Sequence, residues 1–124
     1  NMPERFHLRF LKYDPKKSGE NLGRAHYDRG TITLAIAESS PGLRIGRNPD
    51  SLKKVEHQDR IALFMPAYTL EQITSNEFMP AWHDVMQVGE DRYREDISRW
   101  AMVFFADAYH VKTPNKDQAH TPKY

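Results

Sequence analysis

The chain of 124 residues contains no cysteine. This absence excludes structural disulfides, metal sites built on thiolates and a cysteine nucleophile. It also suits a reducing compartment, so we expect a cytoplasmic protein. No stretch approaches the roughly 18 apolar residues of a membrane span, and the N-terminal residues do not form an apolar run behind a basic segment. We therefore expect a soluble chain with no membrane partner.

A strong excess of one charge is lacking too, because the formal net charge is +1. Residues 1–60 carry twelve Lys/Arg and eight Asp/Glu, giving +4, whereas residues 61–124 carry six and nine, giving −3. A basic half can face nucleic acid or phosphate, although the high pI usual for nucleic-acid binding is missing. The residues we consider for such contacts are Lys16, Lys17, Arg44, Arg47, Lys53 and Lys54.

The first half of the chain has the period-two pattern of strands with one solvated side. In residues 5–13, Phe6 and Phe10 alternate with His7 and Arg9, so we place the two phenylalanines in the core. Residues 24–27 and 31–37 flank a glycine turn and predict a hairpin. Residues 43–47 predict a short strand, and residues 53–57 and 60–65 predict a second hairpin.

The second half has a helical period. Thr69 and Gln72 match a capping box, which predicts a short helix. A second short helix is predicted around Trp82, with Pro80 in its first turn. Glu90–Val111 predicts a long helix, because its apolar residues fall in one stripe of a helical wheel: Tyr93, Ile97, Trp100, Ala101, Phe104, Ala108 and Val111.

Strands followed by helices predict an α+β domain. We expect an N-terminal antiparallel sheet of four to five strands, with two short helices and one long C-terminal helix packed on one face. The alternative is a half-open β-barrel closed by the long helix. Residues 2–112 would form this single domain, and residues 113–124, which lack periodicity, would form a flexible C-terminal tail.

Two His-x-Asp tripeptides are candidate metal ligands: His26 with Asp28, and His57 with Asp59. On a strand, residues two apart face the same way, so such a pair can bind one metal. A third ligand, for which His7 is a candidate, would complete a facial triad with open positions. The alternative is that both tripeptides mark strand ends, where aspartate is common in turns.

Apolar side chains also lie outside the main stripe of the predicted long helix: Met102, Phe105 and Tyr109. A helix that is apolar nearly all round is buried on several sides or contacts a partner. These residues therefore predict an interface with another protein or with a second copy of the chain.

No motif assigns a catalytic residue or a cofactor. The leading hypothesis is a small non-catalytic binding or regulatory protein that acts through this protein–protein interface. One alternative is a nucleic-acid-binding protein that uses the basic N-terminal half. A second alternative is a small metal-dependent enzyme with the His-x-Asp ligands.

Overall fold

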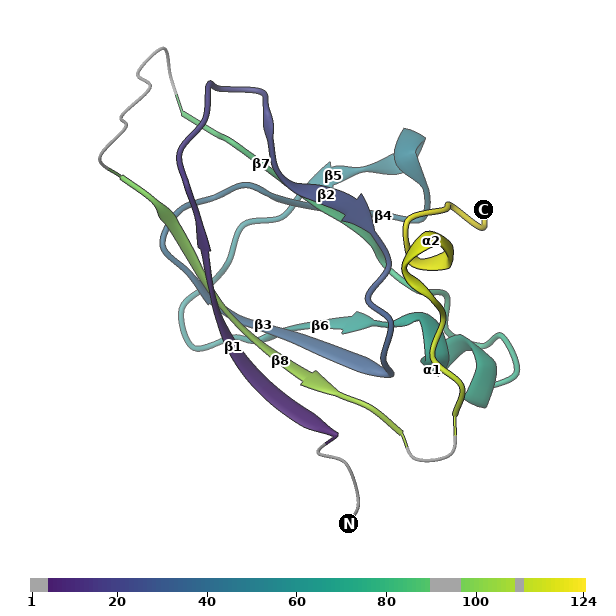
Figure 1. Cartoon of the computed structure of the whole chain (residues 1–124). Helices are drawn as coiled ribbons and strands as arrows, with labels where there is room; N and C mark the ends of the chain where they lie inside the picture. The colour runs from purple at the N-terminus through teal and green to yellow at the C-terminus, as the bar shows by residue number, and fades with distance from the viewer. Residues whose placement is uncertain (1–4, 90–96, 109–110) are drawn as a thin grey trace.

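The computed structural model describes residues 5–89, 97–108 and 111–124, and two four-stranded sheets dominate it. One sheet has the order β1 (Phe6–Tyr13), β8 (Arg99–Ala106), β3 (Ile32–Glu38) and β6 (Leu63–Pro66). The other has the order β2 (Asn21–His26), β7 (Trp82–Met86), β4 (Leu43–Gly46) and β5 (Lys53–Lys54). The two sheets face each other across the interior of the molecule (Figure 1). All neighbouring strands are antiparallel.

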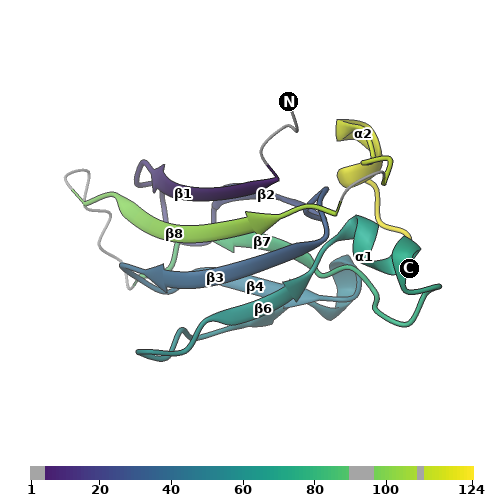
Figure 2. The same cartoon turned by 90° about the horizontal axis from the view of Figure 1, so that it is seen from below.

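The remaining elements are short. A 3-10 helix, η1 (Pro49–Ser51), precedes β5, while α1 (Tyr68–Ile73) follows β6 and α2 (Lys116–Ala119) lies near the C-terminus. Both α-helices lie at the same end of the two sheets (Figure 2). Within the described residues, no helix has the length and apolar character needed to cross a membrane.

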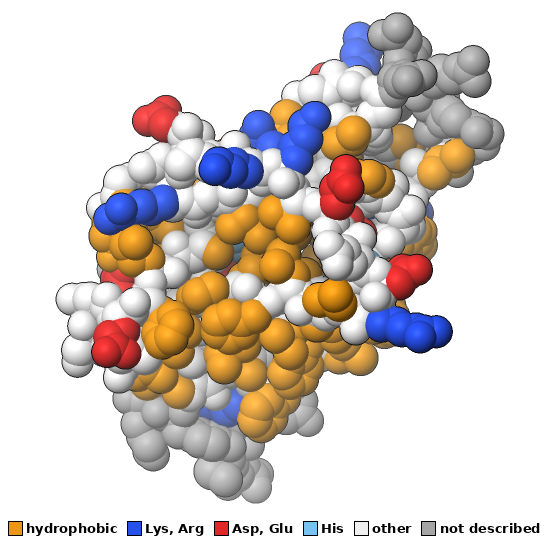
Figure 3. Space-filling model, turned by 180° about the vertical axis from the view of Figure 1, so that it is seen from behind, with side chains coloured by type: hydrophobic (Ala, Val, Ile, Leu, Met, Phe, Trp, Pro, Cys, Tyr) orange, Lys and Arg blue, Asp and Glu red, His pale blue; other side chains and the backbone are white. Residues whose placement is uncertain are grey.

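The sheet of β1, β8, β3 and β6 carries apolar side chains on the face turned away from the other sheet. Leu8, Phe104, Leu34 and Phe64 are consecutive cross-strand partners in one row. The side chains of such a row lie on the same face. Leu8 is 54% exposed and Phe64 46% exposed, and hydrophobic side chains spread broadly over one view of the surface (Figure 3).

The strand predicted over residues 5–13 is present, but the expectation that Phe6 and Phe10 are core residues is wrong. They are 62% and 66% exposed on the outer face. The alternate residues of β1, such as Leu11 and Tyr13, line a cavity between the sheets instead. Period two identifies a strand but does not say which of its faces turns inward.

The predicted α+β fold is wrong, because the long C-terminal helix is absent from the described residues. Residues 99–106 of the predicted Glu90–Val111 helix form β8, and residues 90–96 and 109–110 lie outside the described residues. Because β8 is a central strand with apolar side chains on both faces, its run resembles a buried helix in sequence. The barrel alternative fails on the same point, since it also required the long helix. The architecture is jelly-roll-like, with two antiparallel sheets.

The two short helices have different outcomes. The first is present as α1, but its N-cap is Ala67 and no side chain caps it. Thr69, expected to form the capping box, is buried and its hydroxyl bonds that of Thr31 at 2.9 Å. The second predicted helix is wrong, because Trp82–Met86 forms strand β7 between β2 and β4.

The C-terminal segment contacts the rest of the chain at several points. The Tyr27 amide donates to Ala119 O at 2.8 Å, and the Lys123 amide donates to the Tyr27 hydroxyl at 2.9 Å. Glu71, buried in α1, accepts from the Lys123 ammonium and from the Tyr124 hydroxyl. The mobility of residues 113–124 and the single-domain organisation stay predictions.

Candidate metal centre and adjoining cavity

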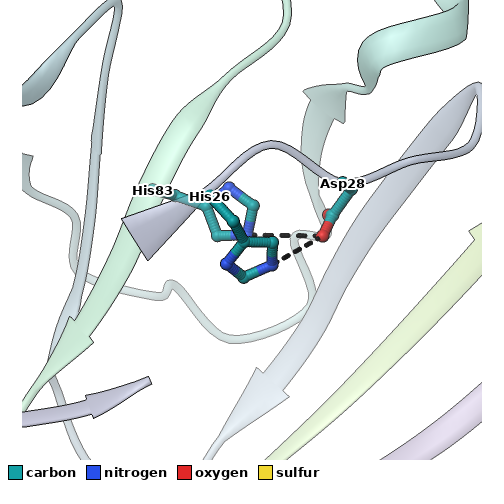
Figure 4. A group of neighbouring side chains, drawn as sticks. All are labelled: His26, Asp28 and His83. Atoms are coloured by element: carbon teal, nitrogen blue, oxygen red, sulfur yellow. Dashed lines mark hydrogen bonds and ion pairs between the residues drawn. The ribbon is translucent and has the colours of Figure 1, made fainter. Parts of the chain in front are cut away.

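Two histidines from separate strands lie side by side at one end of the sheet of β2, β7, β4 and β5. His26, the last residue of β2, pairs with His83 of β7, and their ring centroids are 4.4 Å apart. Asp28 lies two residues beyond His26. Its Oδ1 is 3.2 Å from His26 Nε2 and 3.5 Å from His83 Nε2, so both rings point at one carboxylate (Figure 4). Residues far apart in sequence therefore converge at one point.

The second nitrogen of each ring contacts a backbone carbonyl. His26 Nδ1 lies 2.6 Å from Arg24 O, and His83 Nδ1 lies 2.9 Å from Ala81 O. Because a carbonyl oxygen can only accept, each Nδ1 carries a proton. The Nε2 atoms are then the ring nitrogens directed at Asp28, where they can donate a proton to the carboxylate or, once deprotonated, bind a metal. Hydrogen bonds of this kind fix the tautomer and the orientation of metal-binding histidines.

The Asp28 carboxylate is held in place and kept ionised. Its side chain is 11% exposed, and the Thr33 hydroxyl donates to Oδ2 at 2.6 Å. Burial raises the pKa of Asp28, but the charge of His83 and the hydrogen bonds from both histidines and Thr33 outweigh burial and hold it well below the ordinary value. Burial lowers the pKa of His83, yet the Asp28 carboxylate outweighs that effect and raises it above 6.5. The cluster thus favours a positive charge between its members.

The donor set fits a divalent metal ion. Within the described part of the chain, His26, Asp28 and His83 form the one group of three whose ligand atoms all lie within 4.8 Å of one another. Two imidazoles and one carboxylate are the ligands of the facial triad that holds non-haem Fe(II) and leaves other positions open. Without a metal, protons on the Nε2 atoms let the rings donate to the Asp28 carboxylate, and a divalent cation would take the place of these protons.

The structure separates the two His-x-Asp tripeptides. His26 and Asp28 belong to the group, whereas His57 and Asp59 do not. His57 lies in the segment between β5 and β6, where its backbone N–H donates to the Glu38 carboxylate at 3.3 Å, and Asp59 is exposed in a turn. His7 of β1 lies on a second cavity and is not a member of the group.

Sequence reasoning missed His83, because it placed this residue on a helix, where neighbouring side chains do not share a face. On β7 the partner of His83 is a residue of another strand, and that pairing cannot be read from local spacing. A signal was available, since Trp82–Met86 is a five-residue run between Pro80 and Gly89, a length suited to a strand.

A cavity of about 390 Å³ lies between the sheets, with the metal-binding group among its lining residues. A buried cation, Arg99 of β8, also lines it and is 5% exposed. Its guanidinium donates from Nε to Ser40 O at 3.0 Å and from Nη2 to Glu38 Oε2 at 2.5 Å, and it lies 5.5 Å from the centroid of the Tyr13 ring. The cavity therefore combines the metal-ligand group with an anion-binding side chain. Sequence reasoning missed Arg99, because residues 90–111 were predicted to form a helix and Arg99 lies outside its apolar stripe.

A second cavity, of about 520 Å³, meets the same centre from another side. His26 and Asp28 line both cavities, and so does Phe105 of β8. Arg9 of β1 lies over the Phe105 ring, 5.7 Å from its centroid. A ligand in either cavity would thus lie beside the metal-binding group.

The residues expected to form a protein interface do not share a face. Phe105 lines the two cavities, whereas Met102 pairs with the outward-facing Phe10 of β1 and is half-buried. Tyr109 lies outside the described residues. Contact with a second copy or another protein stays a prediction.

The basic residues expected to contact nucleic acid have varied surroundings. Arg44 forms a bidentate pair with Asp84, at 2.8 and 2.6 Å, and Arg47 lies over the Tyr124 ring. The others are exposed: Lys16 and Lys17 between β1 and β2, and Lys53 and Lys54 on β5.

Comparison with known proteins gives one family. A family model described as the 2OG-Fe(II) oxygenase superfamily matches residues 5–108. No curated protein matches the chain.

Similar solved structures include a putative oxygenase from Shewanella oneidensis, with a TM-score of 0.70 and 21% identity over 83% of this chain and 39% of that one. Full-length Neurospora crassa T7H in complex with alpha-KG has a TM-score of 0.70 and 22% identity over 83% and 33% of the two chains. Its complex with alpha-KG and thymine has a TM-score of 0.71 and 21% identity over 83% of this chain and 33% of that one. At these identities the likeness shows the fold, and the chain spans less than two fifths of the length of these structures.

The family match overturns two expectations from the sequence. A non-catalytic regulatory protein that acts through a protein interface was the leading hypothesis, and nucleic-acid binding was the first alternative. The match over residues 5–108 and the convergence of His26, Asp28 and His83 favour the second alternative, a metal-dependent enzyme. The chain belongs to the 2OG-Fe(II) oxygenase superfamily.

Proposed function

We propose that this chain contains the catalytic core of an oxygenase that uses Fe(II) and 2-oxoglutarate. His26, Asp28 and His83 would hold the metal, and Arg99 would bind the distal carboxylate of 2-oxoglutarate. The observation that carries the proposal is the convergence of two Nε2 atoms on the Asp28 carboxylate, with both Nδ1 atoms bonded to backbone carbonyls. Two solved structures of similar fold are complexes with alpha-KG, which supports the choice of co-substrate.

Bound Fe(II) would supply the site where O2 is activated. Oxidative decarboxylation of 2-oxoglutarate to succinate and CO2 would supply two of the four electrons that reduce O2, and oxidation of a substrate C–H bond to C–OH would supply the other two. The side chains have simpler tasks. The Arg24 and Ala81 carbonyls orient the two imidazoles, and the Thr33 hydroxyl orients Asp28. Arg99 offers a charge that water screens poorly, because it is 5% exposed.

The space around the site suits two organic ligands. The cavity between the sheets contains Arg99 together with apolar walls from Leu43, Val85 and Val103, which would exclude water around the co-substrate. The second cavity is open to a further substrate, with Phe105 and Arg9 beside the metal-binding group.

Calorimetry under nitrogen tests the metal and co-substrate sites. We expect one Fe(II) per chain, and we expect 2-oxoglutarate to bind the Fe(II)-loaded protein more tightly than the metal-free protein. Addition of O2 should then produce succinate and CO2 at a rate that depends on both. A metal-loaded protein that binds no 2-oxoglutarate would contradict the proposed function.

We also propose a cytoplasmic location for the protein. The lack of cysteine supports it, because a cysteine-free chain suits a reducing compartment. Fractionation of cells that express the protein, followed by immunoblotting, checks this location, and recovery in a membrane or secreted fraction would contradict it.

A further inference from the structure

Arg99 already has an anionic partner inside the cavity. Glu38, at the end of β3, is the cross-strand partner of Ala101 in β8. Arg99 lies two residues before Ala101 on the same strand, so the two side chains lie on the same face of the sheet. Glu38 Oε2 accepts from Arg99 Nη2 at 2.5 Å, and its side chain is 11% exposed. The pair is therefore largely removed from water, where both charges interact strongly.

The same carboxylate also contacts the segment between β5 and β6. Its other oxygen, Oε1, accepts from the His57 backbone N–H at 3.3 Å. Val55, Glu56 and His57 of this segment line the cavity that contains Arg99. Glu38 thus links the buried cation to a backbone segment that forms part of the cavity wall.

A second carboxylate cannot use Arg99 fully while Glu38 occupies it. The Nε–H of Arg99 already donates to Ser40 O, so the two terminal nitrogens are the donors that remain for anions. Two carboxylates on one buried guanidinium repel each other at close range, and each would lose part of its hydrogen bonding. An incoming dicarboxylate must therefore displace Glu38 or bind weakly.

We propose that Glu38 is an internal competitor for Arg99 that sets the affinity for the dicarboxylate co-substrate. Binding of the distal carboxylate displaces Glu38 and releases the His57 amide, so occupancy of the cavity loosens the segment of residues 55–61. This inference rests on the proposed function, because it takes 2-oxoglutarate as the ligand of Arg99. Glu38 acts through Arg99 and is a specificity-determining residue for the co-substrate.

The test compares wild-type protein with Glu38→Gln, both loaded with Mn(II) under nitrogen, by calorimetric titration with 2-oxoglutarate. Gln keeps the size of the side chain but removes the competing charge, so we expect 2-oxoglutarate to bind about tenfold more tightly. Pyruvate is a 2-oxo acid without the distal carboxylate, and its affinity should stay within about twofold. Glu56→Gln removes the same charge from another cavity-lining residue that is not paired with Arg99, and we expect a change of less than about threefold.

Hydrogen exchange on the wild-type protein gives a second readout that needs no variant. Saturation with 2-oxoglutarate should speed exchange at the His57 amide, whereas saturation with pyruvate should leave it unchanged. If Glu38→Gln does not fold, hydrogen exchange at the His57 amide of the wild-type protein tests the inference by itself. Weaker or equal binding of 2-oxoglutarate by a folded Glu38→Gln protein, or slower exchange at His57, would overturn the inference. If neither protein binds 2-oxoglutarate although both bind Mn(II), the proposed function has failed as well.

Discussion

His83 Nε2 lies 3.5 Å from Asp28 Oδ1, although the two residues belong to distant parts of the chain. The contact exists because β7 pairs with β2 and places His83 opposite His26. It turns an isolated His-x-Asp tripeptide into a group of three converging ligands. The candidate metal centre therefore depends on the register of one strand pair.

Substitution of His83 tests the metal centre. We expect His83→Ala to lower the affinity for Fe(II) or Mn(II) by about 100-fold or more, since one of three protein ligands is lost. The measurement is anaerobic titration calorimetry. His57→Ala is the matched control, because His57 belongs to the His-x-Asp tripeptide that does not join the group. The metal affinity of this variant should stay within about threefold of the wild-type value. Equal losses in the two variants would contradict the assignment.

Substitution of Arg99 tests the co-substrate site separately from the metal. Arg99→Lys keeps the charge but loses the planar donor geometry, so one charge-assisted hydrogen bond to a carboxylate should be lost. A loss of about 1.5–3 kcal/mol corresponds to roughly 10- to 150-fold weaker binding of 2-oxoglutarate. Metal affinity should be unchanged in the same titrations. The assignment is wrong if the variant binds 2-oxoglutarate as tightly as wild type.

The pair of Arg44 and Asp84 should matter for stability. Asp84 is 3% exposed on β7, and Arg44 of β4 gives it two hydrogen bonds, at 2.8 and 2.6 Å. Arg44→Ala leaves this carboxylate buried without its cation. We expect a loss of about 2 kcal/mol in unfolding free energy, less than for a fully buried pair because Arg44 is partly solvated.

Denaturant titration measures this loss, and an exposed neighbour on β5 supplies the control. Lys53→Ala should change the unfolding free energy by no more than about 0.5 kcal/mol. If Arg44→Ala also lowered the unfolding free energy by no more than about 0.5 kcal/mol, the expectation would be wrong, because water would then replace the guanidinium at little cost.

The C-terminal contacts should weaken at high pH. Burial lowers the pKa of Lys123, but the hydrogen bond and charge of Glu71 outweigh it and raise the pKa above the ordinary 10.5. Stability from a raised pKa is fully present below the unfolded value and is lost as pH rises through the folded value. We expect the contact to be intact below about pH 10 and to fail above the folded pKa of Lys123.

Limited proteolysis after Lys116 or Lys123 as a function of pH, with a protease active in alkali, measures this loosening. Glu71→Gln should make the same segment more susceptible already at neutral pH, while metal binding stays unchanged. Rapid cleavage of the wild-type segment at neutral pH would instead support the flexible tail expected from the sequence.

Part of the fold could be predicted from the sequence. Period-two alternation identified the strands that became β1 and β3, because large apolar residues recur at every second position: Phe6, Leu8 and Phe10 in β1, and Ile32, Leu34 and Ile36 in β3. The prediction of which face of β1 turns inward was wrong. The side of β1 that carries His7, Arg9, Leu11 and Tyr13 lines the two cavities, and the opposite side, with Phe6, Leu8 and Phe10, lies outside.

The strands with two apolar or buried faces could not be predicted. In β8 the residues Trp100 and Phe104 face outward while Val103 and Phe105 face inward, so no alternation remains in the sequence. A short run of this kind is compatible with a helix as well as a strand. The same ambiguity affected Trp82–Met86, and with it the recognition of His83.

The sequence by itself determined the chemistry that is available: no thiolates, a His-x-Asp tripeptide at the end of a strand, and an apolar run long enough for a central strand. The tertiary structure decided which groups meet. Long-range pairing of β2 with β7 brought His83 to Asp28, and the facing of two sheets enclosed Arg99 with Glu38. Such contacts depend on register between distant strands, and local spacing along one chain carries no record of that register.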